Sequence, residues 1–405
     1  MPNLGFPEFE GEWERYKVSD LLDFYSTNSL SWEQLEYDTD QMFNLHYGLI
    51  HVGLPTSLNL NKGKLPNIKK EFLPKKYELC KEGDIAFADA SEDTNDVAKA
   101  IEFTALGNKQ VVCGLHTIHG RDNHNITIVG FKGYAFSSPT FHNQIKRIAQ
   151  GTKIYSISSK NFSECFIGIP SKEEQSKISR LFTLIDERIA TQNRIIEKYE
   201  SLIYGLLDSI VAYPKDDKKY KLGELCEIRS GYSGTQNQMC KGLRVSRIET
   251  ISNHHINLDK VGYVEPFEKS KTYKLNIGDI LFSNINSVEY IGNTAYIDKD
   301  YALYHGMNLL RLIPNKTLVN PFYIYCLLNT QRAKNHFKSV CNKAVSQASI
   351  NQTELSKTPI FIPTISKQEN IARLFDILLR KREIERNNLT LFQKQKAYLL
   401  KEMFV

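Results

Sequence analysis

IGIPSKEEQSKISRLF at residues 167–182 occurs a second time as IFIPTISKQENIARLF at residues 360–375. The match needs no gap, and one offset of 193 positions relates Gln175 to Gln368 as well as every other pair. Self-similarity at a fixed offset indicates a structural unit that occurs more than once. The sequence therefore predicts that the protein contains two copies of one plan.

Each copy continues into a long amphipathic helix. Side chains suited to a helix seam begin within the first block and continue at alternating steps of four and three residues, namely Ile178, Phe182, Ile185, Ile189, Gln192, Ile196, Tyr199, Ile203, Leu206 and Ile210. The same frame after the second block contains Ile371, Phe375, Leu378, Arg382, Glu385, Leu389, Phe392, Lys396, Leu399 and Met403. Such spacing is typical of the a and d positions of a coiled coil. A helix of about 40 residues is about 60 Å long and needs a partner to bury this stripe.

We predict that the two helices pair with each other in antiparallel orientation. Their midpoints then meet, and Gln192 and Glu385 lie near those midpoints. Polar members of a seam can fix the register of pairing, so we assign these two residues that role. The alternative is two unrelated core helices, each amphipathic for its own domain.

The composition allows two or three ordinary domains. The chain has 405 residues, of which 41% are hydrophobic and 11% aromatic, and its formal net charge is +6. A mildly basic balance permits a polyanionic partner without requiring one. The seven scattered cysteines contain no C-x-x-C, which favours reduced thiols. No export signal or membrane-spanning run is apparent, so we expect a soluble cytoplasmic protein that does not contact a membrane.

The repeat also organises the rest of the chain. We divide it into a lead-in at 1–15, a first module at 16–161, a central repeat with its helix at 162–213, a polar linker at 214–219, a second module at 220–354 and a C-terminal repeat with its helix at 355–405. Short matches recur in order in both modules, such as EGDIAF at 82–87 and IGDILF at 277–282. Short alternating apolar runs broken by Gly, Asn and Pro favour an α+β fold. Similar frames with different surfaces indicate a reader of two different targets.

The sequence contains little that suggests catalysis. It has neither a G-x-G-x-x-G motif nor a P-loop. NPFY at 320–323 resembles the Asn-Pro-Pro-Tyr/Phe motif of amino-methyltransferases, but the second proline is missing and Pro321 suits an ordinary helix start. Asp84 and Asp279 each follow a glycine before an apolar strand, which indicates a turn rather than an acid–base pair. We predict no catalytic residue in this chain.

One segment contains residue types that bind zinc. Cys113, His116, His119 and His124 lie close together in the sequence, but no second half with matching spacing follows. A turn at 120–123 interrupts the segment. We interpret these residues as exposed polar side chains around a β-turn and predict no metal site.

Several polar groups are suited to DNA. Arg can bind guanine, Asn and Gln can bind adenine, and Lys can contact phosphates. Candidates occur in the strand–turn predicted at 44–51, in the polar tip around 121–124, on the strand at 244–247 and in the loop after residue 282. The predicted DNA-binding residues are His46, Tyr47, His51, Arg121, Asn123, His124, Lys153, Arg244, Ser246, Arg247, Asn284, Asn286, Lys343 and Gln347. Ordinary solvated surface is the alternative for each.

These features together resemble a known family. They are FPEFEGEWE at 6–14, YGLIH at 47–51, the two Gly-Asp-Ile-x-Phe strands, KGLRVSRI at 241–248 and, above all, the duplicated Ile-x-Ile-Pro blocks. The order and duplication of these motifs resemble the specificity subunit of a type I restriction–modification system along the whole chain.

The resemblance implies an α+β fold in which two globular α/β target recognition domains alternate with two long helices, paired as an antiparallel coiled coil in a pseudo-twofold internal repeat. Each domain would read one half of a bipartite double-stranded DNA target, and the helices would set the spacing. Two modification subunits with S-adenosylmethionine would methylate adenine, and restriction subunits would use ATP and Mg. No cofactor is expected in this chain. A self-sufficient methyltransferase or nuclease and a coiled-coil scaffold without DNA are the alternatives.

Overall fold

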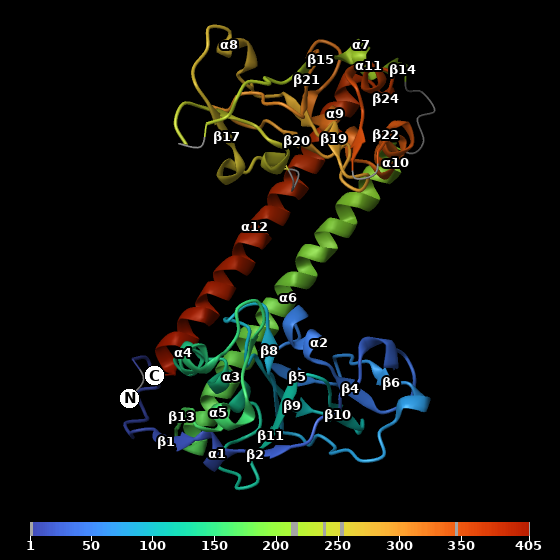
Figure 1. The fold of residues 1–405 in the computed structure, drawn as a ribbon. Helices are drawn as coiled ribbons and strands as arrows, with labels where there is room; N and C mark the ends of the chain where they lie inside the picture. The colour runs from blue at the N-terminus through green and yellow to red at the C-terminus, as the bar shows by residue number, and fades with distance from the viewer. Residues whose placement is uncertain (1–2, 212–217, 238–239, 252–254, 345–346, 405) are drawn as a thin grey trace. The chain divides into compact units, whose positions relative to one another are not determined.

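The computed structural model describes residues 3–211, 218–237, 240–251, 255–344 and 347–404. The chain forms two compact units, unit 1 (Met1–Asn193 with Asn387–Val405) and unit 2 (Arg194–Arg386). Each unit consists of one mixed α/β domain and parts of two long helices, α6 (Lys172–Val211) and α12 (Ile365–Met403) (Figure 1).

The domain of unit 1 is built on a five-stranded sheet. Its order is β2-β11-β7-β9-β5, formed by β2 (Asp23–Tyr25), β11 (Thr117–Arg121), β7 (Ile85–Ala88), β9 (Ala100–Ala105) and β5 (Ser57–Asn59). Only the β5–β9 pair is parallel in this sheet. The strand β1 (Glu14–Lys17) pairs antiparallel with β13 (Phe166–Ile169), which leads directly into α6.

Unit 1 also contains a second sheet. Its order is β10-β4-β6-β3, formed by β10 (Val111–Cys113), β4 (Phe43–Leu45), β6 (Asn67–Ile68) and β3 (Leu35–Glu36). A short pair joins β8 (Ala90–Ser91) to β12 (Tyr155–Ser156). The helices are α1 (Val18–Leu21), η1 (Trp32–Gln34), α2 (Tyr47–Val52), η2 (Lys70–Phe72), α3 (Lys132–Phe136), α4 (Pro139–Ile148) and α5 (Ser159–Ser163).

Unit 2 repeats the frame of unit 1. Its main sheet has the order β15-β21-β18-β20, formed by β15 (Cys226–Ser230), β21 (Leu310–Pro314), β18 (Ile280–Phe282) and β20 (Thr294–Tyr296). The strand β14 (Lys218–Lys221) pairs with β24 (Pro359–Ile362), which leads into α12. The helices of the frame are α7 (Leu222–Leu225), α9 (Pro321–Leu328), α10 (Gln331–Val340) and α11 (Gln352–Ser356).

The remaining strands of unit 2 form two further sheets. The strands β16 (Leu243–Val245) and β17 (Gly262–Val264) form a hairpin, and a three-stranded sheet joins β19 (Ile285–Asn286), β23 (Ala348–Ser349) and β22 (Asn342–Lys343). The β19–β23 pair repeats the β8–β12 pair of unit 1. The short helices are η3 (Ile248–Ile251), η4 (Leu258–Lys260) and α8 (Ser270–Tyr273).

The repeat includes the hydrogen bonds that hold the frame. Gly83 and Gly278 have φ of 87° and 100°, and the following aspartates, Asp84 and Asp279, each accept a backbone N–H three residues back. The prediction of a turn before a strand is therefore confirmed at both positions. At the start of the long helices, Gln175 Nε2 donates to the carbonyl of Pro170 at 2.9 Å, and Gln368 does the same to Pro363 at 3.0 Å.

The seam of the long helices is confirmed by burial. Among the residues whose side chains the structure describes, every predicted seam position is buried or half-buried. In unit 1, Asp186 pairs with Lys396 at 2.6 Å while Phe182 lies against Phe404, so later residues of α6 meet earlier residues of α12. In unit 2, Glu200 pairs with Arg386 at 2.5 Å. The helices therefore run antiparallel within unit 1, and the predicted fold class is confirmed.

The register residues remain a prediction. Gln192 is buried in unit 1, and Glu385 is half-buried in unit 2. Their role as a polar pair in the seam stays untested.

Three local predictions can be compared with the structure. The strand–turn predicted at 44–51 is wrong, because β4 ends at Leu45 and α2 follows. Residues 214–217 of the predicted linker lie outside the described residues, and β14 begins at Lys218. The interpretation of NPFY as a helix start is confirmed, since Asn320 caps α9 with Pro321 in its first turn. No helix among the described residues is long and apolar enough to span a membrane.

Candidate nucleic-acid interface

The predicted DNA-binding residues of unit 1 lie at two different ends of the five-stranded sheet. β7 and β11 are antiparallel, with Thr117 opposite Ala88 at one end and Gly120 opposite Ile85 at the other. Three steps of about 3.3 Å separate the two ends by about 10 Å. Arg121, Asn123 and His124 follow the second end, whereas the residues near His51 gather at the first.

At the first end, aromatic and imidazole rings form a cluster, which we call the aromatic surface (Trp32, His46, Tyr47, His51 and His116). The ring centroids of Trp32 and His46 lie 4.4 Å apart, and those of His46 and Tyr47 lie 4.7 Å apart. Tyr47 also meets His51 and His116 edge-on, at 5.8 and 5.2 Å. Trp32 is 44% exposed, so the cluster is open to solvent at one side.

The hydrogen bonds of this surface set the state of its imidazoles. His46 caps α2 because its Nδ1 accepts the backbone N–H of Gly48 at 3.2 Å. Burial lowers the pKa of His46, which favours the neutral ring. His51 Nε2 lies 2.9 Å from the carbonyl of Ala90 and must donate to it, which leaves Nδ1 as an acceptor. That Nδ1 is buried and has no partner among the described residues.

The strand β8 connects the aromatic surface to Lys153. Ala90 of β8 binds His51 and pairs with Ser156 of β12. Lys153 is exposed in the loop just before β12. The structure therefore gathers His46, Tyr47 and His51 in one cluster and places Lys153 in the loop before the strand that pairs with β8.

Arg121 does not join this surface. It is 6% exposed, and its guanidinium donates to both oxygens of Asp84 at 2.9 and 2.8 Å and to Glu78 at 2.7 Å. In unit 2, Arg311 of the equivalent strand binds Asp279 at 2.6 Å. Arg311 lies opposite Leu281 as His119 lies opposite Ala86, so the frame repeats an Asp–Arg pair but not the position of its arginine. The guanidinium of Arg121 is occupied within unit 1, and its DNA contact stays a prediction.

The neighbours of Arg121 are exposed but also lie away from the aromatic surface. Asn123 Nδ2 donates to Asp23 at 2.6 Å and to the hydroxyl of Tyr25 at 2.8 Å. His124 is exposed, and its backbone N–H is held by Asp122. DNA binding by Asn123 and His124 stays a prediction.

In unit 2, the three-stranded sheet gathers predicted residues from two distant segments. Asn286 of β19 and Lys343 of β22 both pair with Ala348, so their side chains share one face. Gln347 is exposed next to β23. Asn284 precedes β19, and its Oδ1 is buried without a partner among the described residues. We call this the amide surface (Asn284, Asn286, Lys343 and Gln347).

The residues predicted on the strand at 244–247 differ in their availability. Ser246 is fully buried and accepts the N–H of Gly306 at 3.0 Å, so its hydroxyl is used by the protein. Arg244 donates to the carbonyl of Tyr301 at 2.9 Å, whereas Arg247 is exposed. Arg247 is therefore the member of this group that solvent reaches most easily.

Sequence reasoning missed aromatic residues in both units. In unit 2, the rings of Tyr232 and Phe267 stack 4.0 Å apart, and Tyr273 meets both edge-on. In unit 1, Trp32 and Asp89 were missed, although Asp89 lies 3.1 Å from His116 and burial raises its pKa against the effect of that imidazole. A search for aromatic residues at turn boundaries would have found Trp32 and Tyr232.

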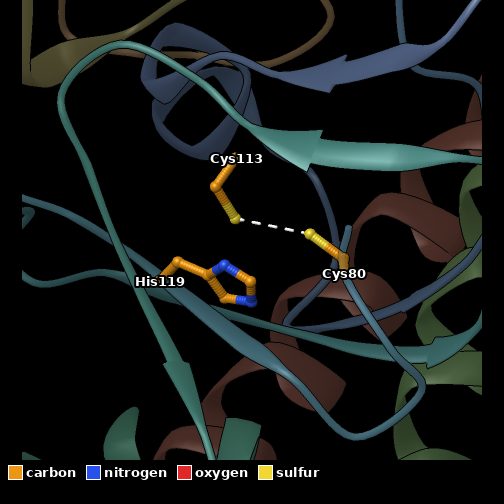
Figure 2. Close-up of side chains that lie close together, drawn as sticks. All are labelled: Cys80, Cys113 and His119. Carbon is orange, nitrogen blue, oxygen red and sulfur yellow. Dashed lines mark hydrogen bonds between the residues drawn. The ribbon is translucent and has the colours of Figure 1, made fainter. Parts of the chain in front are cut away.

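The interpretation of Cys113 and His119 as exposed turn residues is wrong. Cys113 ends the buried strand β10, and His119 lies in the buried strand β11. Their side chains meet Cys80, which the sequence did not suggest (Figure 2). The three ligand atoms all lie within 4.8 Å of one another, whereas His124 lies outside this group.

Comparisons with known proteins agree with this architecture. Residues 101–201 and 214–391 match the family described as type I restriction modification DNA specificity domain. The chain is 41% identical over 200 residues to a putative type I restriction enzyme MjaX specificity subunit of Methanocaldococcus jannaschii, covering 47% of this chain and 46% of that protein. It is 22% identical over 282 residues to the MjaVIII specificity subunit of the same organism, covering 63% and 65%. The matches thus span about half to two thirds of these relatives.

Two solved structures have a similar fold. The S subunit of a type I restriction-modification system from M. genitalium matches with a TM-score of 0.59 at 16% identity, covering 100% of this chain and 99% of that one. The second structure is described as the structural basis of complex assembly and conformational transition of the type I R-M system. One of its chains matches with a TM-score of 0.59 at 16% identity, with 96% of both chains covered. At this identity the likeness concerns the fold.

Proposed function

The chain belongs to the family of type I restriction modification DNA specificity domains, and from this premise we propose that it is a non-catalytic subunit that reads DNA for partner enzymes. Each unit would read one half of a bipartite double-stranded target. Two modification subunits would methylate adenine with S-adenosylmethionine, and restriction subunits would use ATP and Mg. All of this chemistry would belong to the partner chains.

The observation that carries the proposal is one frame with two unlike surfaces. The frame repeats the sheet order, the Asp–Arg pair and the Gln at the start of each long helix. The aromatic surface and the amide surface, by contrast, have different residues. A protein that read the same half-site twice would be expected to repeat these surfaces together with the frame.

The two surfaces suit two kinds of DNA contact. Asn side chains such as Asn286 can bind adenine N6 and N7, and Lys343 can contact a phosphate. The rings around Tyr47, open to solvent at Trp32, suit aromatic contacts with bases. We therefore expect the two half-sites to differ in sequence.

The long helices would set the distance between half-sites. α6 has 40 residues and is therefore about 60 Å long, close to two duplex turns of about 34 Å each. Adding seven residues to both helices, after Asn193 and before Asn387, adds about 10 Å or about three base pairs. We expect a longer spacer in the methylated target, and an unchanged spacer would contradict this role.

The helices would also dock the two modification subunits. Two copies of the same partner need the same surface twice, and Leu184 of α6 and Ile377 of α12 occupy equivalent positions in the repeat. Both are exposed, at 55% and 47%. Leu184→Glu and Ile377→Glu should each remove one modification subunit from the purified complex. Thr191→Glu in α6 is the control for added charge, and loss of both partners from a single variant would contradict two separate docking sites.

The decisive experiment maps methylated adenines after coexpression with the modification partner. We expect methylation at one bipartite sequence, and replacement of residues 16–161 by those of a relative should change one half of it only. The chain alone with S-adenosylmethionine should methylate nothing, whereas methylation by the chain alone would favour a fused methyltransferase. Methylation at unchanged sites after the replacement would overturn the proposal, and no DNA binding would favour a scaffold.

A further inference from the structure

Three soft metal ligands meet in the core of unit 1. Cys80 is held beside β10 because its N–H donates to the carbonyl of Val111 at 2.8 Å. Cys113 is the last residue of β10, and His119 is the middle residue of β11. The exposed fractions of these residues are 5%, 1% and 0%. Figure 2 shows the two sulfur atoms facing each other with the imidazole ring beside them.

The spacing of these atoms fits a metal ion. The Sγ atoms of Cys80 and Cys113 lie 3.6 Å apart, and all three ligand atoms lie within 4.8 Å of one another. Two sulfurs that each lie about 2.3 Å from a tetrahedral zinc ion are about 3.8 Å apart. The thiols are therefore close to the separation of two thiolates on one ion and farther apart than the roughly 2.05 Å of a disulfide.

His119 has the orientation of a metal ligand. Its Nε2 lies 2.7 Å from Asp84 Oδ2, so Nε2 carries the proton and donates it to the carboxylate. The other nitrogen, Nδ1, then has a free lone pair, is buried and has no hydrogen-bond partner among the described residues. A carboxylate on the far nitrogen is the usual second partner of a metal-bound histidine. Buried nitrogens without any partner are uncommon, so an ion at Nδ1 explains this one.

The charges near the cluster also suit a cation. Asp84 is paired with Arg121, whose guanidinium also binds Glu78, so these carboxylates already have a partner. Two buried thiolates without a countercharge would be costly, so both groups are neutral thiols as long as no ion is bound. An ion bound to both sulfurs supplies that charge, and the two thiol protons leave to solvent when it binds.

We propose that Cys80, Cys113 and His119 bind a thiophilic transition-metal ion, Zn²⁺ or Cu⁺. Two thiolates and an imidazole suit both ions, and a water molecule would complete the tetrahedral shell of Zn²⁺. The site would join two layers of unit 1, because Cys113 belongs to the sheet that contains β4 and His119 belongs to the sheet of the repeated frame. The metal would thereby fix the sheet next to the aromatic surface onto the frame.

The site would be confined to one unit. Among the described residues, Cys80, Cys113 and His119 form the single group of three or more such ligands that meets this geometry. Unit 2 has buried cysteines of its own, among them Cys226 and Cys326, which serve as internal controls. Loss of the metal should therefore loosen unit 1 and leave unit 2 unchanged.

The first test measures metal in the full-length chain, purified without chelators, by mass spectrometry of the elements. We expect one equivalent of zinc or copper per chain, and the element found decides between Zn²⁺ and Cu⁺. Cys80→Ser and His119→Gln should each contain at least about tenfold less metal. Removing a metal ligand should weaken metal binding at least as much as removing the hydrogen-bond partner of a ligand, which weakens it about tenfold or more. Cys326→Ser, a buried thiol of unit 2, should keep all of it. Full metal content in both Cys80→Ser and His119→Gln would overturn the proposal.

A second test does not depend on variants that fail to fold. Co²⁺ added to the metal-free wild-type chain should give thiolate-to-cobalt charge-transfer absorption, and added Zn²⁺ should remove it. Hydrogen exchange at β10 and β11 should slow when metal is added, with no change at β18 and β21. Absence of both metal and charge-transfer absorption would overturn the proposal, as would a Cys80–Cys113 disulfide found by mass spectrometry under non-reducing conditions.

Discussion

Glu102 in unit 1 and Tyr296 in unit 2 occupy equivalent positions in the repeated sheet, since Glu102 pairs with Ile85 and Tyr296 with Ile280. Glu102 is completely buried and accepts the N–H groups of Gly130 and Gly133 at 2.8 Å, with Lys132 at 3.2 Å. Tyr296 packs instead on aromatic rings, including Phe322 at 5.0 Å.

This difference shows how a duplicated frame tolerates divergence. The two positions have the same place in the sheet. In unit 1 a buried ion pair holds α3 against the sheet, whereas in unit 2 aromatic packing holds α9. A buried ion pair depends on both partners, whereas a hydrophobic contact tolerates shape-conserving changes. The two units should therefore respond differently to matched substitutions.

The largest expected effect breaks the ion pair. Lys132→Ala leaves the carboxylate of Glu102 buried without its cation, which should cost unit 1 about 3–5 kcal/mol of stability. Hydrogen exchange at β9 and β20 measures the two units separately, and only β9 should lose protection. In unit 2, Tyr296→Phe at the position equivalent to Glu102 should cost less than about 1.5 kcal/mol. Equal loss in both units after Lys132→Ala would show that the comparison is wrong.

The next effect tests what the two units share. Gln175 and Gln368 bind the same backbone positions, and each also accepts an N–H from its own domain, from Ile128 and Asn320. Gln175→Ala and Gln368→Ala should each cost about 1–3 kcal/mol, because buried backbone groups lose their partners. Exchange measurements should place each loss in its own unit. If only one of the two variants lost stability, the repeated glutamine would not stabilise the two units equally.

The third prediction concerns the free energy of DNA binding, and its effect is similar to or smaller than that of the glutamine variants. Tyr47→Ala should weaken binding through one half-site and Asn286→Ala through the other, each by about 1–3 kcal/mol. Binding to targets altered in one half at a time distinguishes the two. Ser176→Ala, at an exposed position of α6, is the control and should leave both halves unchanged. Equal weakening at both halves by either variant would indicate a general contact with the backbone of DNA.

The smallest effect is a dependence on pH. Burial raises the pKa of Glu102, against the lowering effect of Lys132, above its usual value of 4.5. A raised folded pKa adds stability that is fully present below the unfolded value and is lost as the pH rises through the folded value. As the pH rises through the folded pKa of Glu102, the hydrogen-exchange protection of β9 should fall relative to that of β20. Glu102→Gln should abolish this pH dependence. Parallel pH profiles for β9 and β20 in the wild type would contradict this.

The sequence was sufficient for the features that repeat. Periodicity identified the seam from Ile178 to Met403, and the fixed offset identified the two frames, because both signals are local or directly matched in the sequence. The position of Cys80 beside Cys113 was not accessible in this way, since strand pairing brings together residues 33 positions apart. Arg121 was taken for a polar tip because its partner Asp84 lies in the turn before β7, 37 positions away. The helix α2 was missed because six residues show too little periodicity.

The two units differ in the point during synthesis at which all residues of their cores become available for folding. Unit 2 is one continuous segment, whereas unit 1 consists of residues 1–193 and the last turns of α12. Phe404 is 3% exposed and packs on Trp13, Phe131 and Phe182. Residues 1–193 therefore cannot complete their aromatic core until the segment after unit 2 has been synthesised. Until then that core is exposed to solvent. The later half can fold before the earlier one, and chains released early would expose that core to chaperones and proteases.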